Sequence, residues 1–190
     1  MGEVEGEVRD EKLDAEREAV RRLALAQVRQ YPDPVLRLKA NEVEVFDVAL
    51  ESLVDRMGRL MREARGVGLA ASQIGILQRV FVYQTDEEAP IVAVVNPRLA
   101  DESEDRQTAD EGCLSLSAAS VVVPVERPTR VRVEAVSATG EPISVEAEGL
   151  EARVIQHELD HLDGVLTIDR TTPEARRRAL AELRPQPFAG

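Results

Sequence analysis

The stretch QHELDH, residues 156–161, contains both histidines of the chain, His157 and His161, with Glu158 directly after the first. On an α-helix, residues four positions apart lie one turn apart along the axis and about 40° apart around it, so the two imidazoles point the same way. Two imidazoles in this arrangement can bind one metal ion, with the glutamate beside the ion without being its ligand. The alternative interpretation is a charged helix face that carries two surface histidines.

The sequence contains one further soft metal ligand, Cys113, in the segment EGCLS at residues 111–115. A lone cysteine is often a small buried hydrophobic residue. Here, however, one cysteine and two histidines are the complete set of soft ligands, which suits three protein ligands and an open fourth position. Such a set is typical of a catalytic site, whereas a structural zinc site closes with a fourth protein ligand. The sequence therefore favours a catalytic metal site.

The composition indicates an acidic single domain of 190 residues, with a formal net charge of −12. This charge argues against general binding to DNA or to an anionic membrane, both of which need a basic surface. No apolar run approaches the roughly 20 residues of a membrane-spanning helix, and the acidic N-terminus does not resemble a secretory signal. A single cysteine excludes an intramolecular disulfide and fits a reducing compartment, so we expect a cytoplasmic protein.

Helical patterns surround a central group of strands. Apolar residues recur at helical spacing between Phe46 and Met61, which predicts a helix. Asp47 is expected to cap its start, and the helix should end near Gly66. Two more helices are expected at residues 150–162, before the C-cap Gly164, and at residues 171–184, capped by Thr171 or Thr172.

The strands are short, and one acidic segment interrupts them. Residues 101–110 are expected to form an exposed connection, because they are acidic and lack a clear apolar face. Helix, several strands and helix together predict an α+β fold with an antiparallel sheet. The predicted strands are residues 79–84, 91–97, 129–136 and 141–149.

Three motifs occur in the order that is found in the peptide deformylases, and the chain resembles this family on their account. Each motif is short, but three in the family order are highly specific. The resemblance covers residues 28–170. It leaves outside an acidic N-terminal extension at residues 1–27 and a C-terminal helix and tail at residues 171–190. The motifs are GVGLAASQ at 66–73, EGCLS at 111–115 and QHELDH at 156–161, with further similarity in YPDPVLR at 31–37 and DGVLTIDR at 163–170.

The resemblance implies an enzyme that uses one metal ion to remove the formyl group from the N-terminal methionine of nascent peptides. By motif match, Cys113, His157 and His161 would hold the ion, and Glu158 would transfer the proton. The family favours Fe²⁺ in the cell, and the ligand set also suits Zn²⁺, Ni²⁺ or Co²⁺ in purified protein. The implied fold packs antiparallel strands around the metal-bearing helix, with a helix at each end of the chain.

The same resemblance assigns the groups that contact the substrate. Gln73 and the backbone N–H of Leu114 would bind the oxyanion that forms transiently during hydrolysis. Gly68 would pair with the substrate backbone, because a glycine lets another backbone approach closely. The substrate pocket would also include Val67, Ala109 and Leu150.

The sequence departs from the family pattern at positions around the expected methionine pocket. The segment after Cys113 lacks the usual large apolar residue and proline, and smaller residues replace larger ones elsewhere. Because lost side-chain volume weakens selection by an apolar pocket, we expect a relaxed side-chain preference. The positions are Ala109, Ser117, Ala118, Ser120 and Thr167.

Other functions are consistent with parts of this pattern. A related hydrolase could act on another N-acyl amine, and a non-catalytic relative could serve only as a binding protein. A general HExxH endopeptidase would more often recruit a third histidine or a glutamate as ligand. Arg176, Arg177 and Arg178 in the last helix suggest weak contact with the ribosome, and a solvated helix face is the alternative.

Overall fold

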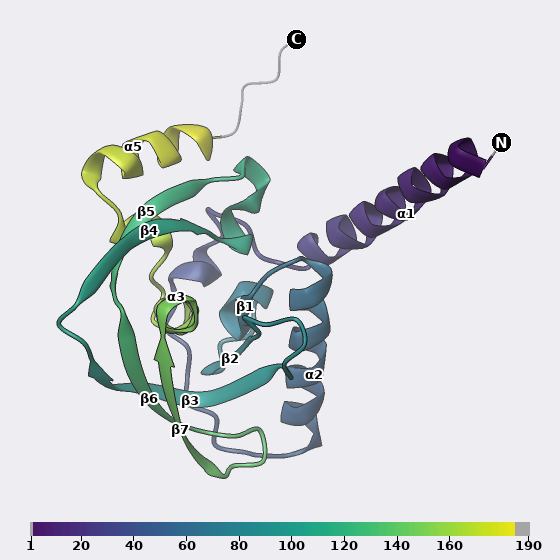
Figure 1. Cartoon of the computed structure of the whole chain (residues 1–190). Coiled ribbons are helices and arrows are strands. Elements are labelled where there is room, and N and C mark those ends of the chain that lie inside the picture. Colours follow the sequence, from purple (N-terminus) through teal and green to yellow (C-terminus); the bar gives the residue numbers. More distant parts are fainter. Residues whose placement is uncertain (1, 185–190) are drawn as a thin grey trace.

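Two antiparallel sheets with a helix between them form the body of the protein, as Figure 1 shows. The computed structural model describes residues 2–184, and for residues 2–13 and 117–119 it describes the backbone only. The larger sheet has the strand order β1-β2-β3-β6-β7, and the smaller sheet pairs β4 with β5. Helix α3 is seen end-on between them. The predicted α+β fold, with antiparallel strands around the metal-bearing helix and a helix at each end, is confirmed.

The elements follow in this order: α1 Gly2–Leu25, η1 Pro34–Arg37, α2 Val48–Glu63, β1 Gly68–Ala70, η2 Ala71–Ile74, β2 Val80–Tyr83, β3 Val92–Glu102, β4 Arg106–Gly112, η3 Leu114–Ala119, β5 Val122–Pro128, β6 Arg130–Val136, β7 Pro142–Glu148, α3 Gly149–Leu162, α4 Thr167–Arg170 and α5 Pro173–Glu182.

Helix α2 packs its apolar face against β1 and β2, as the helical spacing predicts. Asp47 caps its start, because the carboxylate accepts hydrogen bonds from the backbone N–H groups of Ala49 and Leu50 at 3.0 and 3.1 Å. The helix ends at Glu63, slightly before the expected position near Gly66. Arg65 has a φ of +58°, and this left-handed conformation ends the helix.

The expectation of an exposed connection at residues 101–110 is wrong. Strand β3 extends to Glu102, and β4 begins at Arg106, so only three residues separate the two strands. Strand β4 pairs along its whole length with β5, Val122–Pro128, a strand that is not among those predicted. The segment is exposed as expected, but its charged side chains lie on the solvent side of paired backbone and obscure the strand pattern.

Helix α3 is buried on most of its surface, because sheets cover it on two sides. Ile155 and Leu162 join a core cluster with Phe81 of β2 and Val133 of β6. The helix also buries polar residues, which is costly unless they find partners. One example is Gln156, which donates hydrogen bonds to two backbone carbonyl groups at 2.9 and 3.1 Å. Polar side chains at such depth point to a role beyond packing.

Gly164 ends this helix as predicted. It has a φ of +74°, and its N–H donates to the carbonyl of His161 at 3.2 Å. A side chain would not fit there, because a Cβ atom would lie 2.6 Å from the carbonyl oxygen of Arg37.

The last turn of α1, within the N-terminal extension at residues 1–27, is part of the core. Helix α1 projects from the body at its N-terminal end (Figure 1), but its last turn packs on α2. Ala24 is fully buried and Val28 is 4% exposed, and both belong to the core cluster around Met57 and Met61. The physical reason is size: small side chains allow the helix to approach α2 closely without producing a strong apolar pattern in the sequence.

The C-terminal helix α5 begins as expected. Thr172 accepts a hydrogen bond from the N–H of Ala175 at 3.2 Å, and Pro173 occupies the first helical position. Part of the predicted C-terminal tail, residues 185–190, lies outside the described residues. Within residues 2–184, no helix has both the length and the apolar character that crossing a membrane requires.

The packing of α3 predicts a large difference between two leucine truncations. Leu162→Ala should reduce the free energy of unfolding by about 2–5 kcal/mol, because the side chain is fully buried and leaves a cavity. Leu23→Ala in α1 is the matched control, since Leu23 is 70% exposed, and it should change stability by less than about 0.5 kcal/mol. Urea denaturation of both variants measures this difference. Equal effects would contradict the central position of α3 in the core.

Candidate metal centre

Helix α3 brings both histidines to one point, as their spacing predicts. The Nε2 atoms of His157 and His161 lie 3.2 Å apart. His161 is 1% exposed, and Glu158, one residue after His157, is 3% exposed. The interpretation as two surface histidines on a solvated helix face is therefore wrong.

Cys113 reaches the same point from a different part of the fold. It lies between β4 and η3, where the chain leaves the small sheet and turns toward α3. Its Sγ atom is 3.2 Å from Nε2 of His161. The ligand atoms of Cys113, His157 and His161 all lie within 4.8 Å of one another.

This donor set fits a divalent metal ion. With usual bond lengths and tetrahedral angles, two imidazole nitrogens around zinc lie about 3.3 Å apart, close to the separation of the two Nε2 atoms. Burial lowers the pKa of His161 well below its ordinary value, which favours the neutral imidazole that binds metal. Burial also lowers the pKa of His157, but its contacts with Cys113 and Glu111 outweigh burial and raise it. A metal ion would compete with that proton for the ring.

Glu111 orients His157, a role that the sequence analysis did not assign. Its Oε2 atom lies 3.1 Å from Nδ1 of His157, so Nε2 is left facing the other ligand atoms. Burial raises the pKa of Glu111, but hydrogen bonds from Arg127 and His157 outweigh burial and lower it to about 2. The carboxylate is thus charged at neutral pH. Its position in EGCLS, two residues before Cys113, is the only signal in the sequence that could have indicated this role.

Glu158 lies beside the three ligand atoms in a confined space. Burial raises the pKa of its carboxyl group to about 7, and Oε2 has no hydrogen-bond partner among the described residues. Gly68 of β1 packs directly against it: a Cβ atom at that position would lie 2.3 Å from Oε1 of Glu158. A glycine is therefore required opposite the glutamate.

Gln73 approaches Cys113 from η2. Its side-chain oxygen accepts a hydrogen bond from the N–H of Ala70 at 2.8 Å, which fixes the orientation of the amide. The Nε2 atom lies 3.2 Å from Oγ of Ser115 and 3.7 Å from Sγ of Cys113. Gln73 therefore presents N–H groups toward the centre. Leu114 follows Cys113, and its carbonyl accepts a hydrogen bond from Gln30 at 2.8 Å.

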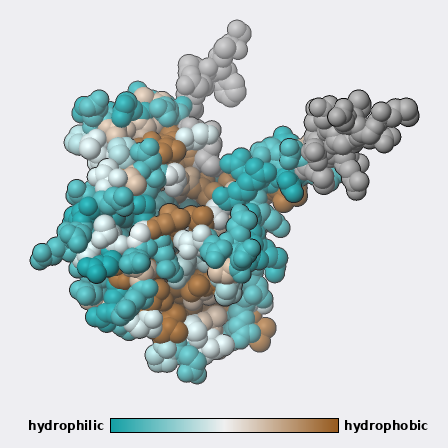
Figure 2. Space-filling view, in the orientation of Figure 1, coloured by the Kyte–Doolittle hydropathy of each residue, from teal (hydrophilic) through white to brown (hydrophobic). Residues whose placement is uncertain are grey.

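A cavity of about 420 Å³ opens onto these groups from one side. Figure 2 shows hydrophobic side chains gathered near the middle of this face, where the surface is otherwise mostly hydrophilic. Three exposed apolar residues line the cavity: Val67, Val122 and Leu150. An extended peptide with an apolar side chain fits such a surface. The lining also includes Gly68, Gln73, Cys113, Leu114, Ser120, His157 and Glu158.

Not all of the residues at which the sequence departs from the family pattern line the cavity. Ser120 lines the cavity, whereas Ala109 is not among the lining residues, although its neighbour Asp110 is. Thr167 is buried in α4 and does not line the cavity either. The side chains of Ser117 and Ala118 lie outside the described residues.

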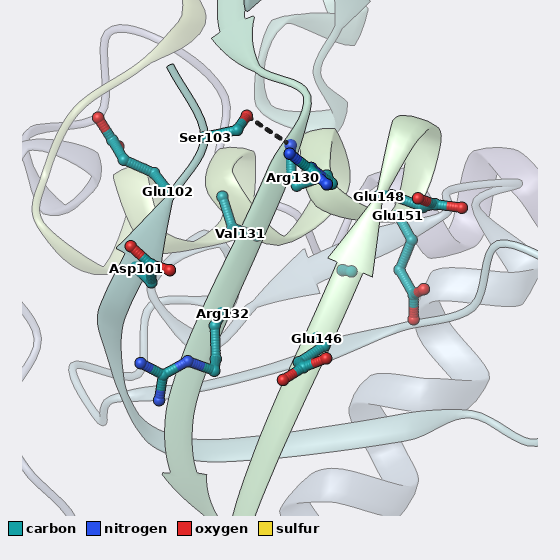
Figure 3. A pocket seen from close by; sticks show the side chains of 10 residues that line it. Asp101, Glu102, Ser103, Arg130, Val131, Arg132, Glu146, Glu148 and Glu151 are labelled. Atoms are coloured by element: carbon teal, nitrogen blue, oxygen red, sulfur yellow. Dashed lines mark hydrogen bonds between the residues drawn. The ribbon is translucent and has the colours of Figure 1, made fainter. Parts of the chain in front are cut away.

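A second cavity, of about 600 Å³, lies across β3, β6 and β7 (Figure 3). It contains five carboxylates and two guanidinium groups, and one of its hydrogen bonds joins Ser103 to the N–H of Arg130 at 3.1 Å. No histidine or cysteine lines it. Although this cavity is larger, only the smaller one combines metal ligands with a buried carboxylic acid.

The fold and the site together define a class of protein. Two histidines of an HExxH helix, a third ligand from a neighbouring strand end, and a buried glutamate characterise hydrolases that depend on a single metal ion. An open cavity beside the ligands provides access for the substrate.

The chain belongs to the polypeptide deformylase family, which matches residues 25–177. It is 45% identical to the peptide deformylase of Acidothermus cellulolyticus, over 88% of this chain and 91% of that protein. The crystal structure of peptide deformylase from Thermotoga maritima superposes with a TM-score of 0.72 at 44% identity, covering 77% of this chain and 97% of that chain. Peptide deformylase 1B of Arabidopsis thaliana, in complex with an inhibitor, gives 0.78 at 37% identity, covering 82% and 87%.

The contact between Gly68 and Glu158 predicts a severe effect from one methyl group. Gly68→Ala should displace the carboxylate and lower turnover per bound metal ion by about 10²-fold or more, the usual value of a positioned acid–base group. Metal content should not change, because no ligand is touched. Gly112→Ala is the matched control: its Cβ atom would meet nothing nearer than Val122, at 3.8 Å, and the loss should be much smaller. Equal losses of turnover in both variants would show that the contact between Gly68 and Glu158 is not the cause.

Proposed function

We propose that the protein removes the formyl group from the N-terminal formyl-methionine of newly made polypeptides and releases formate. The observation that carries this proposal is the convergence of Cys113, His157 and His161 beside Glu158 at one end of a peptide-sized cavity. Hydrolases of other N-acyl amines and non-catalytic binding proteins are not favoured, since the relatives named above are peptide deformylases. A general endopeptidase is disfavoured by the cysteine ligand.

Cys113, His157 and His161 would hold one divalent ion, which we propose to be Fe²⁺ in the cell. The same ligands suit Zn²⁺, Ni²⁺ or Co²⁺ in purified protein. When bound, such an ion supplies the acidity that makes water reactive at neutral pH, and it polarises the carbonyl group under attack. The ring of His157 is held in place for this task by Glu111.

Glu158 is proposed to transfer the proton. Its carboxyl group, with a pKa raised to about 7 by burial, is suited both to accept a proton from the attacking water and to pass it to the departing amine. Because the carboxyl group is buried against Gly68, few groups other than the substrate and the attacking water can exchange that proton. The result is one C–N bond broken, formate released and a free α-amino group on methionine.

Gln73 and the backbone N–H of Leu114 are proposed to stabilise the oxyanion. Gln73 is well suited because its amide is already oriented by Ala70, so no rearrangement is needed during the reaction. Glutamine is also uncharged, which avoids trapping an anion that exists only briefly. The N–H of Leu114 would complete a pair of donors beside Cys113.

The substrate backbone is proposed to lie along β1. This strand is at the edge of the larger sheet and pairs only with β2, so an extended peptide can add to its other side at Gly68. Val67 and Leu150 would contact the peptide at the cavity wall. Ala109 does not line the cavity, although its neighbour Asp110 in β4 does.

Two wider proposals concern where the protein acts. We place it in the cytoplasm, where nascent chains carry formyl-methionine and where its lone thiol stays reduced. A weak contact with the ribosome through α5 is proposed on the basis of Arg177 and Arg178, which are exposed, whereas Arg176 pairs with Asp169 at 3.3 Å. Co-sedimentation of wild type and an Arg177→Gln, Arg178→Gln variant with ribosomes tests it.

The direct test of the proposed function is an anaerobic assay of formate release from a formyl-methionyl peptide, with metal analysis of the same sample. Turnover that requires about one bound ion per chain is expected. Protein that contains its ion but releases no formate would contradict the proposal.

Metal binding should depend on Cys113 and not on Glu158. Cys113→Ala removes a thiolate ligand, so a chelator should take the ion from this variant at a concentration at which wild type keeps it. Glu158→Gln is the matched control, because it keeps all three ligands and should keep the ion. Full occupancy in Cys113→Ala under this competition would show that the ligand assignment is wrong.

Turnover should depend on Glu158 even though metal binding does not. Glu158→Gln keeps the shape of the side chain but removes the proton acceptor, so kcat should fall by about 10²–10⁴. Circular dichroism and metal content should match wild type. A variant that loses its metal and its fold together would instead identify Glu158 as a structural residue, and one with near-normal kcat would refute the proton-transfer role.

A further inference from the structure

Two arginines stand in the wall of the cavity that contains the metal centre. Arg21 comes from the last turns of α1, within the N-terminal extension, and Arg65 lies between α2 and β1. They are about 40 residues apart in sequence, but one carboxylate, that of Glu18, lies near both. The extension therefore contributes a charged side chain to the substrate cavity.

Among the side chains that the structure describes, both guanidinium groups make only weak contacts. Arg21 contacts Glu18 at 3.4 Å and Arg65 contacts it at 3.9 Å, distances at which a hydrogen bond is weak or absent. Nε of Arg21 is buried and has no partner among the described residues. Arg153, in the same cavity, is different: it donates three hydrogen bonds of 2.7–2.9 Å to Glu111 and to backbone carbonyls. Arg21 and Arg65 thus have donors left for a ligand.

The acidic groups of the cavity do not neutralise these two arginines. Glu111 is occupied by Arg127, Arg153 and His157. Glu158 is buried against Gly68, and Asp110 belongs to β4 in the small sheet. The two positive charges of Arg21 and Arg65 face the single carboxylate of Glu18, so this part of the wall is locally positive in a protein whose formal net charge is −12.

The position of Arg65 relates this charge to the substrate. If the peptide pairs with β1 at Gly68 and points its formyl group toward Glu158, its chain runs past Gly66 toward Arg65. An extended peptide advances about 3.4 Å per residue, so the residues two and three positions after the formyl-methionine pass the turn at residues 64–67 that carries Arg65. The side chains that reach Arg65 and Arg21 are then those of the third and fourth residues. This step rests on the proposed function.

We propose that Arg21 and Arg65 select formylated peptides that carry a carboxylate at the third or fourth residue. Guanidinium groups bind carboxylates through paired N–H···O contacts, which suits an acidic side chain or the C-terminus of a short peptide. The net charge of the protein acts in the opposite sense, because an acidic surface attracts basic peptides. A preference for acidic peptides therefore requires a local cause.

Four amidated peptides test the selection: formyl-Met-Ala followed by Glu-Glu, Gln-Gln, Lys-Lys or Ala-Ala. Amidation removes the terminal carboxylate, so charge differs only at the third and fourth residues. At low salt, KM for the Glu-Glu peptide should be about three- to tenfold below that for Gln-Gln, the combined effect of two partly exposed ion pairs, and the difference should shrink at high salt. The preference should be in KM and not in kcat.

A matched pair of double variants locates the effect. Arg21→Gln with Arg65→Gln should abolish the difference in KM between the Glu-Glu and Gln-Gln peptides. Arg22→Gln with Arg59→Gln changes the net charge equally, at exposed positions of α1 and α2 that do not line the cavity, and should keep the difference. Loss of the preference in both variants would attribute it to the overall charge and overturn the proposal.

The outcome is separable from that of the proposed function. Calorimetric binding of the same four peptides without the formyl group reports the charge preference even in the absence of turnover. Deformylation of all four formyl peptides with equal KM would leave the proposed function standing and refute the role of Arg21 and Arg65. If no peptide yields formate, the proposed function is refuted. If wild type nevertheless binds the Glu-Glu peptide more tightly than the Gln-Gln peptide, and the Arg21→Gln, Arg65→Gln variant does not, the binding site stands.

Discussion

The carboxylate of Glu111 connects the parts of the molecule that must meet at the metal centre. It lies on β4, accepts hydrogen bonds from Arg127 of β5 at 2.7 and 2.9 Å, and orients His157 of α3. Arg127 in turn binds Asp160 of α3 at 2.8 Å. Removing one member of a buried ion pair leaves an uncompensated charge, at a cost of about 3–5 kcal/mol. These ion pairs and hydrogen bonds therefore fix the position of the small sheet relative to α3.

This network explains how a helix as polar as α3 can occupy the middle of the fold. Buried polar groups are costly unless each finds a partner, and the partners here come from the small sheet and from the helix itself. The apolar residues of α3, such as Ile155 and Leu162, face the larger sheet. One helix thus carries the core contacts, the anchors to the small sheet and two proposed metal ligands. The helix that carries two of the candidate metal ligands is thus also part of the core.

The local features of this site could be predicted from the sequence, and its long-range features could not. The spacing of His157 and His161 fixes their common direction, and Cys113 is the only cysteine in the sequence that can join them. The role of Glu111 depends on a contact across 46 residues, which no local pattern records. Strand β4 was missed because charged side chains obscure its alternation, and β5 was missed because Pro124 and Pro128 are unusual in strands and the charged Arg127 is buried. Arg21 was missed because α1 packs through small residues such as Ala24.

The lone cysteine makes the centre vulnerable to oxidants in a particular way. Cys113 is half-buried in the cavity wall, and the sequence contains no second thiol. An oxidised cysteine is usually rescued by a neighbouring cysteine that converts a sulfenic acid into a disulfide. This chain has no such residue, so recovery requires a small thiol that enters the cavity from solution. A peptide in the cavity would block the entry of an oxidant as well as that of the thiol, so both oxidation and recovery of Cys113 are expected between turnovers.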